Sequence, residues 1–120
     1  MMSMSAKTFE DLIVWQKAHA LVLDVYRVSK EFPKEEIFGL TSQLRRAAVS
    51  VPSNIVEGFN RMGTADKLKF YNYAEASLEE TRYQLMLAQD LEFAETKQAQ
   101  ESCKEVKRIL TAYTRSIKTT

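Results

Sequence analysis

The chain has 120 residues, of which 45% are hydrophobic and 28% are charged, and its formal net charge is +1. This length and balance fit one globular domain and exclude a disordered chain. Three glycines and two prolines are too few turn signals for an all-β sandwich. With one cysteine and no long apolar run, the chain can form no internal disulfide and offers no membrane span. We therefore expect a cytoplasmic protein.

The first predicted helix covers residues 9–32. Its apolar side chains recur every three or four residues, which places them on one face of a helix. They are Val14, Ala18, Leu21, Val25, Val28 and Phe32. Pro33 disfavours a helical conformation at Phe32 and ends the helix. We expect residues 1–8 to be disordered or extended, and residues 9–118 to form the domain.

The second predicted helix begins at Leu40 and ends near Gly58. Its apolar face also follows the helical spacing and contains Leu40, Leu44, Ala47, Val51 and Ile55. Pro52 lies inside this pattern, where it lacks an N–H donor and its ring clashes with the carbonyl of Ala48. We expect a kink at Pro52, and the alternative is two short helices.

The third and fourth predicted helices cover residues 64–91 and the segment from about residue 97 to 118. Thr64 is expected as the N-cap of the third helix, with Asp66 in its first turn. The fourth helix has the clearest apolar face: Ala99, Cys103, Val106, Leu110, Tyr113 and Ile117. Four long helices joined by short connections predict an all-α fold, an up-down-up-down antiparallel four-helix bundle.

Several apolar residues lie away from the predicted core faces. They are Ile13, Ala20 and Leu23 in the first helix, and Phe70, Tyr73 and Leu87 in the third. One interpretation is a broad core face with a few exposed apolar side chains, which are common on protein surfaces. The other is a second apolar face buried between subunits. We favour the second interpretation and expect an oligomer.

The residues needed for catalysis or for metal binding are missing from the sequence. A di-iron bundle needs Glu-x-x-His pairs, but the single histidine, His19, follows Gln16 at that spacing. One cysteine and one histidine exclude a zinc site, and no phosphate-binding glycine loop is present. We interpret His19 as a structural residue among apolar neighbours and Cys103 as a small core residue. The protein is therefore expected to have no metal, no cofactor and no enzymatic activity.

Charge is distributed unevenly along the chain. Residues 64–93 carry a net charge of −3, whereas residues 94–120 carry +3. Cations in the last segment recur at helical spacing, which is typical of a surface that binds nucleic-acid phosphates. The candidate nucleic-acid-binding residues are Lys97, Lys104, Lys107, Arg108, Arg115 and Lys118. The alternative is a solvated helix face in which three glutamates are interspersed.

Two further groups of polar residues have both a functional and a structural interpretation. The stretch from Lys67 to Tyr73 alternates cations with aromatic rings, on which single-stranded nucleic acid could stack; the alternative is core and subunit packing. A second group predicts a structural polar network between the second and third helices, with a small-ligand pocket as the alternative. This network comprises Arg45, Arg46, Asn54, Glu57, Ser77 and Glu80.

The same residues carry a resemblance to a known family. The segments are FEDLIVWQKAHAL, FPKEEIFGLTSQLRRAAVSVPSNIVEGFNR and the spaced pattern F..Y.EASLEE in the third helix. From Phe9 to Phe93 the chain resembles the bacterial four-helix-bundle proteins encoded in intervening sequences of 23S ribosomal RNA genes. Two departures stand out: Ala76-Ser77 replaces a common Gly-Ser, and Glu92-Phe93 stands where relatives often have a glycine.

The resemblance implies a homopentameric assembly. It also implies kinship with the accessory variability proteins of diversity-generating retroelements, which bind a reverse transcriptase and RNA through basic surfaces. We therefore expect a non-enzymatic oligomeric scaffold that binds RNA or another nucleic acid, as an accessory to a reverse transcriptase. The alternative is a protein-interaction adaptor that does not touch nucleic acid.

Overall fold

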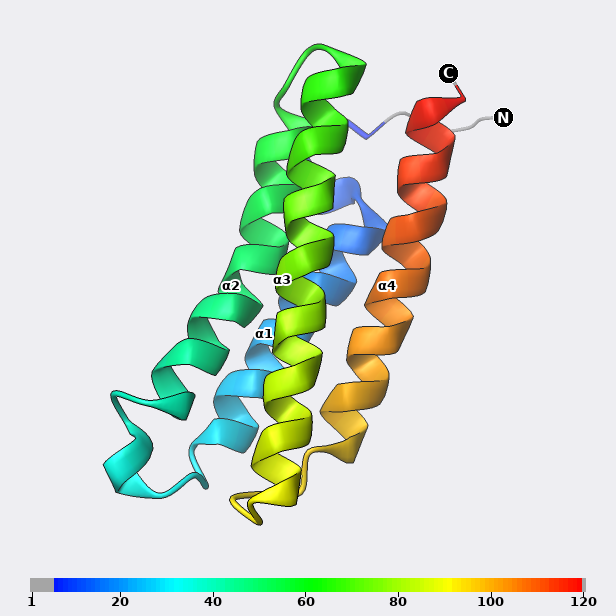
Figure 1. The fold of residues 1–120 in the computed structure, drawn as a ribbon. Coiled ribbons are helices and arrows are strands. Elements are labelled where there is room, and N and C mark those ends of the chain that lie inside the picture. Colours follow the sequence, from blue (N-terminus) through cyan, green and yellow to red (C-terminus); the bar gives the residue numbers. More distant parts are fainter. Residues whose placement is uncertain (1–5, 120) are drawn as a thin grey trace.

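The computed structural model describes residues 6–119, and within this range the chain is all helical, with four α-helices and no strand. The four helices are α1 (Ile13–Ser29), α2 (Leu40–Phe59), α3 (Thr64–Asp90) and α4 (Lys97–Lys118). Two short 3₁₀ turns, η1 (Phe9–Asp11) and η2 (Lys34–Glu36), precede α1 and α2. Consecutive helices run in opposite directions (Figure 1). The predicted all-α four-helix bundle is therefore confirmed.

The four helices form an elongated bundle of 48 × 23 × 20 Å. Each helix packs against two others: α2 lies between α1 and α3, and α4 lies between α3 and α1. The predicted apolar faces form the core, in which Ala18, Val25, Leu44 and Leu85 are completely buried. None of the described helices is both long enough and apolar enough to cross a membrane.

The first helix is shorter than predicted at both ends. Residues 9–11 form the 3₁₀ turn η1, and Leu12 is extended, so α1 begins at Ile13. The carboxylate of Asp11 accepts hydrogen bonds from the backbone N–H groups of Lys7 and Thr8, at 2.9 and 3.1 Å. These bonds lower the pKa of Asp11 and hold the turn. Of the segment expected to be disordered or extended, residues 1–5 lie outside the described residues, and Thr8 is extended.

The second helix is continuous through its proline. Pro52 is buried inside α2, which runs unbroken from Leu40 to Phe59, so the alternative of two short helices is wrong. Apolar burial on both sides of Pro52, at Val51 and Ile55, holds the helix together although Pro52 lacks an N–H donor. The kink at this position stays a prediction.

Candidate nucleic-acid interface

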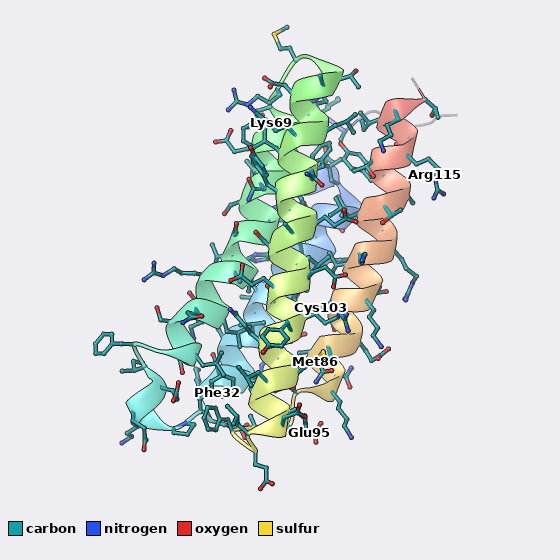
Figure 2. The ribbon with its side chains drawn as sticks, viewed as in Figure 1. Phe32, Lys69, Met86, Glu95, Cys103 and Arg115 are labelled. Atoms are coloured by element: carbon teal, nitrogen blue, oxygen red, sulfur yellow. The ribbon has the colours of Figure 1, made fainter. Side chains whose placement is uncertain are left out.

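Helix α4 separates an apolar face from a cationic face. Ala99, Cys103, Val106 and Leu110 are buried against the other helices. Burial raises the pKa of the Cys103 thiol to about 12, which makes it an inert core residue and not a nucleophile. Lys97, Lys104, Arg108 and Arg115 are exposed on the opposite side, and Figure 2 shows Arg115 extending outward from α4. The spacing of seven, four and seven residues produces this separation, because it keeps the four cations on one side of the helix.

A shallow groove of about 520 Å³, the α3–α4 groove, lies between α3 and α4. It is lined by Glu79, Arg82, Lys104, Lys107, Arg108, Thr111, Ala112 and Arg115. Four of the six predicted nucleic-acid-binding residues therefore meet here. Lys97 and Lys118 lie at the two ends of α4, outside the groove.

Arg82 is a groove residue that the sequence analysis did not identify. It lies on α3, in the segment whose net charge is −3, so the charge count concealed it. Its Nε atom donates to Oε1 of Glu79 at 3.0 Å. The i,i+3 spacing of Glu79 and Arg82, on a helix neighbouring α4 in a bundle, was the available signal.

Glu79 organises the cations of the groove. Its carboxylate accepts hydrogen bonds from Lys107 on α4 and from Arg82 on its own helix, and these bonds lower the pKa of Glu79. The same contact with Glu79 raises the pKa of Lys107. Lys107 and Arg82 are therefore fixed across the groove as a charged bridge between the two helices.

Two arginines of the groove have no acidic partner among residues 6–119. Lys104 pairs with Glu101 at 3.2 Å. Among residues 6–119, in contrast, neither Arg108 nor Arg115 forms an ion pair. A guanidinium group offers a planar set of donors that matches a phosphate, so these two side chains are suited to bind an anionic backbone.

The predicted polar network between the second and third helices differs in the structure, because Arg45 turns towards α1. Its Nε atom donates to Oγ of the buried Ser29 at 2.8 Å, and its guanidinium lies 4.6 Å from the ring centroid of Tyr26. A buried hydroxyl and an aromatic face satisfy this arginine. No buried carboxylate is needed as its partner.

The contact that joins α2 and α3 is a small hydroxyl–amide cluster. Ser77 Oγ donates to Ser50 Oγ at 3.0 Å. Asn54 Nδ2 donates to the carbonyl oxygen and the hydroxyl of Ser50, at 2.9 and 3.0 Å. Ser77 and Asn54 therefore meet as predicted members of the network, through Ser50, which the sequence analysis did not include.

The two glutamates of the predicted network are exposed. Glu57 pairs with Arg61, just beyond the end of α2, at 3.3 Å, and Glu80 accepts a hydrogen bond from Gln84 on α3. Arg46 is exposed as well. Water solvates these charges, so neither glutamate is a buried carboxylate within the predicted network.

His19 and the Lys67–Tyr73 stretch also take structural positions. His19 stacks on its apolar neighbour Trp15, with ring centroids 5.0 Å apart, while its side chain remains exposed. Phe70 is covered by the guanidinium of Arg61 at 4.6 Å and by the ammonium of Lys69 at 5.0 Å. Within this stretch, Lys69 therefore already contacts the aromatic ring of Phe70. Within the described range, no cluster of three His, Cys, Asp or Glu residues could hold a metal ion.

Comparison with known proteins identifies the family. The sequence model of the 23S rRNA-intervening sequence proteins matches residues 10–114. The chain belongs to this family. A crystal structure from Bacteroides thetaiotaomicron, described as a protein with unknown function from the S23 ribosomal protein family, superposes with a TM-score of 0.77. It is 22% identical in sequence, and the match covers 86% of this chain and 96% of that one. No curated protein matches the chain.

The family-like segment around Gly58 has a clear structural role. The ring of the buried Tyr71 lies against the Cα atom of Gly58, where α2 and α3 approach closely. Lys67 donates to the last carbonyl groups of α2, at Gly58 and Phe59, at 3.3 and 2.8 Å. Ala76 stands where relatives commonly have a glycine. It is exposed, so its additional methyl group does not push two helices apart.

Proposed function

We propose that this member of the 23S rRNA-intervening sequence family is a non-enzymatic oligomeric scaffold that binds RNA or another nucleic acid through the α3–α4 groove. The observation that carries the proposal is the convergence of five cations in one groove. Once Glu79 and Glu101 are counted, three positive charges remain in excess there. Cations in this arrangement displace the counterions of a nucleic acid, which makes binding favourable at low salt.

We propose a homopentamer as the assembly, on the resemblance described above. Each protomer contributes a groove of modest charge, and several grooves on one particle would bind a single nucleic acid with greater avidity than one groove alone. The exposed side chains of Ile13 and Leu23, which are 57% and 51% accessible on the outer side of α1, support a subunit contact. The protein partner proposed for this assembly is a reverse transcriptase.

Charge reversal in the groove tests the proposal. Fluorescence anisotropy with a structured RNA at low salt should show that Arg108→Glu/Arg115→Glu weakens binding by about tenfold or more. Lys30→Glu/Lys34→Glu changes the net charge equally at exposed positions near the α1–α2 connection, and it should change the affinity by no more than about twofold. Equal weakening by both double variants, or no binding by the wild type, would contradict the proposal.

The exposed side chains at the α1–α2 connection support the second candidate function, a protein-interaction adaptor. Phe38 is 94% accessible and its neighbour Ile37 is 51% accessible. An apolar pair so exposed marks a contact surface for another protein. If the adaptor function is correct, Phe38→Ser abolishes capture of the reverse transcriptase, and the groove variant leaves capture unchanged.

A further inference from the structure

We infer that the α3–α4 groove binds the backbone of double-stranded nucleic acid in preference to a single strand. This inference rests on the proposed function and names its substrate class. Three observations support it. Two concern the groove itself, namely the side chains that line it and the arrangement of its cations. The third is that the ring of Phe70, elsewhere on α3, is covered by neighbouring side chains.

The lining of the groove contains no aromatic side chain. Beyond the charged residues, only Thr111 and Ala112 contribute, and both are small. Proteins that bind single strands combine a basic groove with aromatic rings on which the unpaired bases stack. This groove offers contacts to phosphates and none to the faces of bases. A duplex presents its phosphates outside and keeps its bases stacked inside, so it loses nothing by binding here.

Three of the groove cations project from one continuous helix. Lys104, Arg108 and Arg115 lie on one side of α4, over a length of about 16 Å at 1.5 Å per residue. A duplex carries one charge for about every 1.7 Å of its axis, roughly twice the density of one of its strands. A stiff duplex meets such a row without ordering, whereas a flexible strand must lose conformational entropy to follow it.

The ring of Phe70, which lies in the Lys67–Tyr73 stretch considered for base stacking, is already covered. Phe70 on α3 lies beneath Arg61, and its ring also contacts the ring of Tyr73 edge-on, with centroids 5.8 Å apart. This cluster lies outside the α3–α4 groove. A base could stack on Phe70 only by displacing Arg61, so the cluster does not extend the groove into a single-strand channel.

A competition between duplex and single strand tests the inference. The probes are an RNA duplex and a DNA duplex of about 20 base pairs and one unstructured strand of the same length, measured by anisotropy at about 100 mM salt. Both duplexes should bind about tenfold more tightly than the strand, because the duplex has the denser charge. Arg108→Glu/Arg115→Glu should abolish this preference, and Phe70→Ala should leave it unchanged.

The outcomes separate this inference from the proposed function. Equal or tighter binding of the single strand overturns the duplex preference but leaves nucleic-acid binding intact. Loss of single-strand binding in Phe70→Ala overturns the argument that this ring is covered, because it places the bases on Phe70. Binding of neither probe at low salt overturns the proposed function together with the inference. Circular dichroism of each variant confirms that it is folded, since all three altered side chains lie outside the buried core.

Discussion

Gly58 shows how one residue fixes the distance between two helices. It is buried in the last turns of α2, and a Cβ atom at this position would overlap the ring of Tyr71. That ring is fully buried, and its hydroxyl lies 3.1 Å from the hydroxyl of Tyr113 on α4. Burial, followed by the hydrogen bond with Tyr113, raises the pKa of Tyr71. Because Gly58 has no side chain, the Tyr71 ring can pack against α2 while its hydroxyl contacts Tyr113 on α4. This contact joins the three helices.

Gly58→Ala is expected to destabilise the protein. Alanine gains about 1 kcal/mol of helix propensity, but the collision with a fixed ring costs more, and we expect a net loss of about 2 kcal/mol. The measurement is the free energy of unfolding in urea. Gly63→Ala is the control, because nothing lies within 4 Å of its Cβ position, and it should lose less than about 1 kcal/mol, the cost of alanine at an N-cap. Equal effects of the two changes would contradict the close contact.

Helix α3 ends in a turn that usually contains a glycine, although this chain has none there. The N–H of Phe93 bonds the carbonyl of Ala88 at 2.9 Å, and the N–H of Glu92 bonds the carbonyl of Gln89 at 3.0 Å. This is a Schellman motif, which normally ends in a glycine. Glu92 occupies the left-handed position with φ of 62°. The packing of the Phe93 ring against the tilted ring of Phe32, with centroids 5.8 Å apart, helps to hold this strained turn.

Glu92→Gly is therefore expected to stabilise the protein. Glycine adopts the left-handed conformation without the steric cost that a side chain incurs, which is about 1 kcal/mol. Glu92 is exposed and loses no packing on replacement. The midpoint of urea unfolding should rise with an unchanged slope. A lower midpoint would show that the turn depends on the glutamate side chain.

The helices themselves were predictable from the sequence, whereas several of their ends were not. Apolar periodicity identified all four helices because each buries one face. It failed at residue 9, where Asp11 holds a 3₁₀ turn. The capping preference of threonine failed at Thr64, which is the first helical residue, while Gly63 is the N-cap. Local hydrogen bonds decide such ends. They depend on tertiary contacts that periodicity does not contain.

The candidate site could be predicted only in part. Spacing found the cations of α4, since a single helix orders them. It did not by itself place Arg82 beside them, because α3 and α4 are separate in sequence and their packing brings Arg82 into the groove. For the same reason it misassigned Arg45, whose partner Ser29 lies on α1.

At the scale of the whole molecule, the exposed apolar residues are the basis of the proposed assembly. Leu23 and Ile13 remain accessible on α1, and Tyr83 is 59% accessible on α3. A bundle that buries a complete core within one chain has no internal use for these side chains. They would be covered if copies of the chain associate.

Light scattering coupled to size exclusion measures this assembly. The wild type should elute with a mass several times that of one chain. Ala20→Glu/Leu23→Glu should shift the particle towards a single chain, because it places charge in an apolar contact. Both side chains are exposed in one chain, so the double variant should keep its helical content. A wild type that stays monomeric at micromolar concentration contradicts the oligomer.

The salt dependence of binding tests the central claim, phosphate contact by the α3–α4 groove, most directly. The logarithm of the affinity for an RNA duplex is measured against the logarithm of the salt concentration, for the wild type and for Arg108→Gln/Arg115→Gln. Each phosphate contact contributes about 0.9 to the slope, so the wild-type slope should be steeper by about 2. Identical slopes for the two proteins would show that these arginines touch no phosphate, and the account would be wrong.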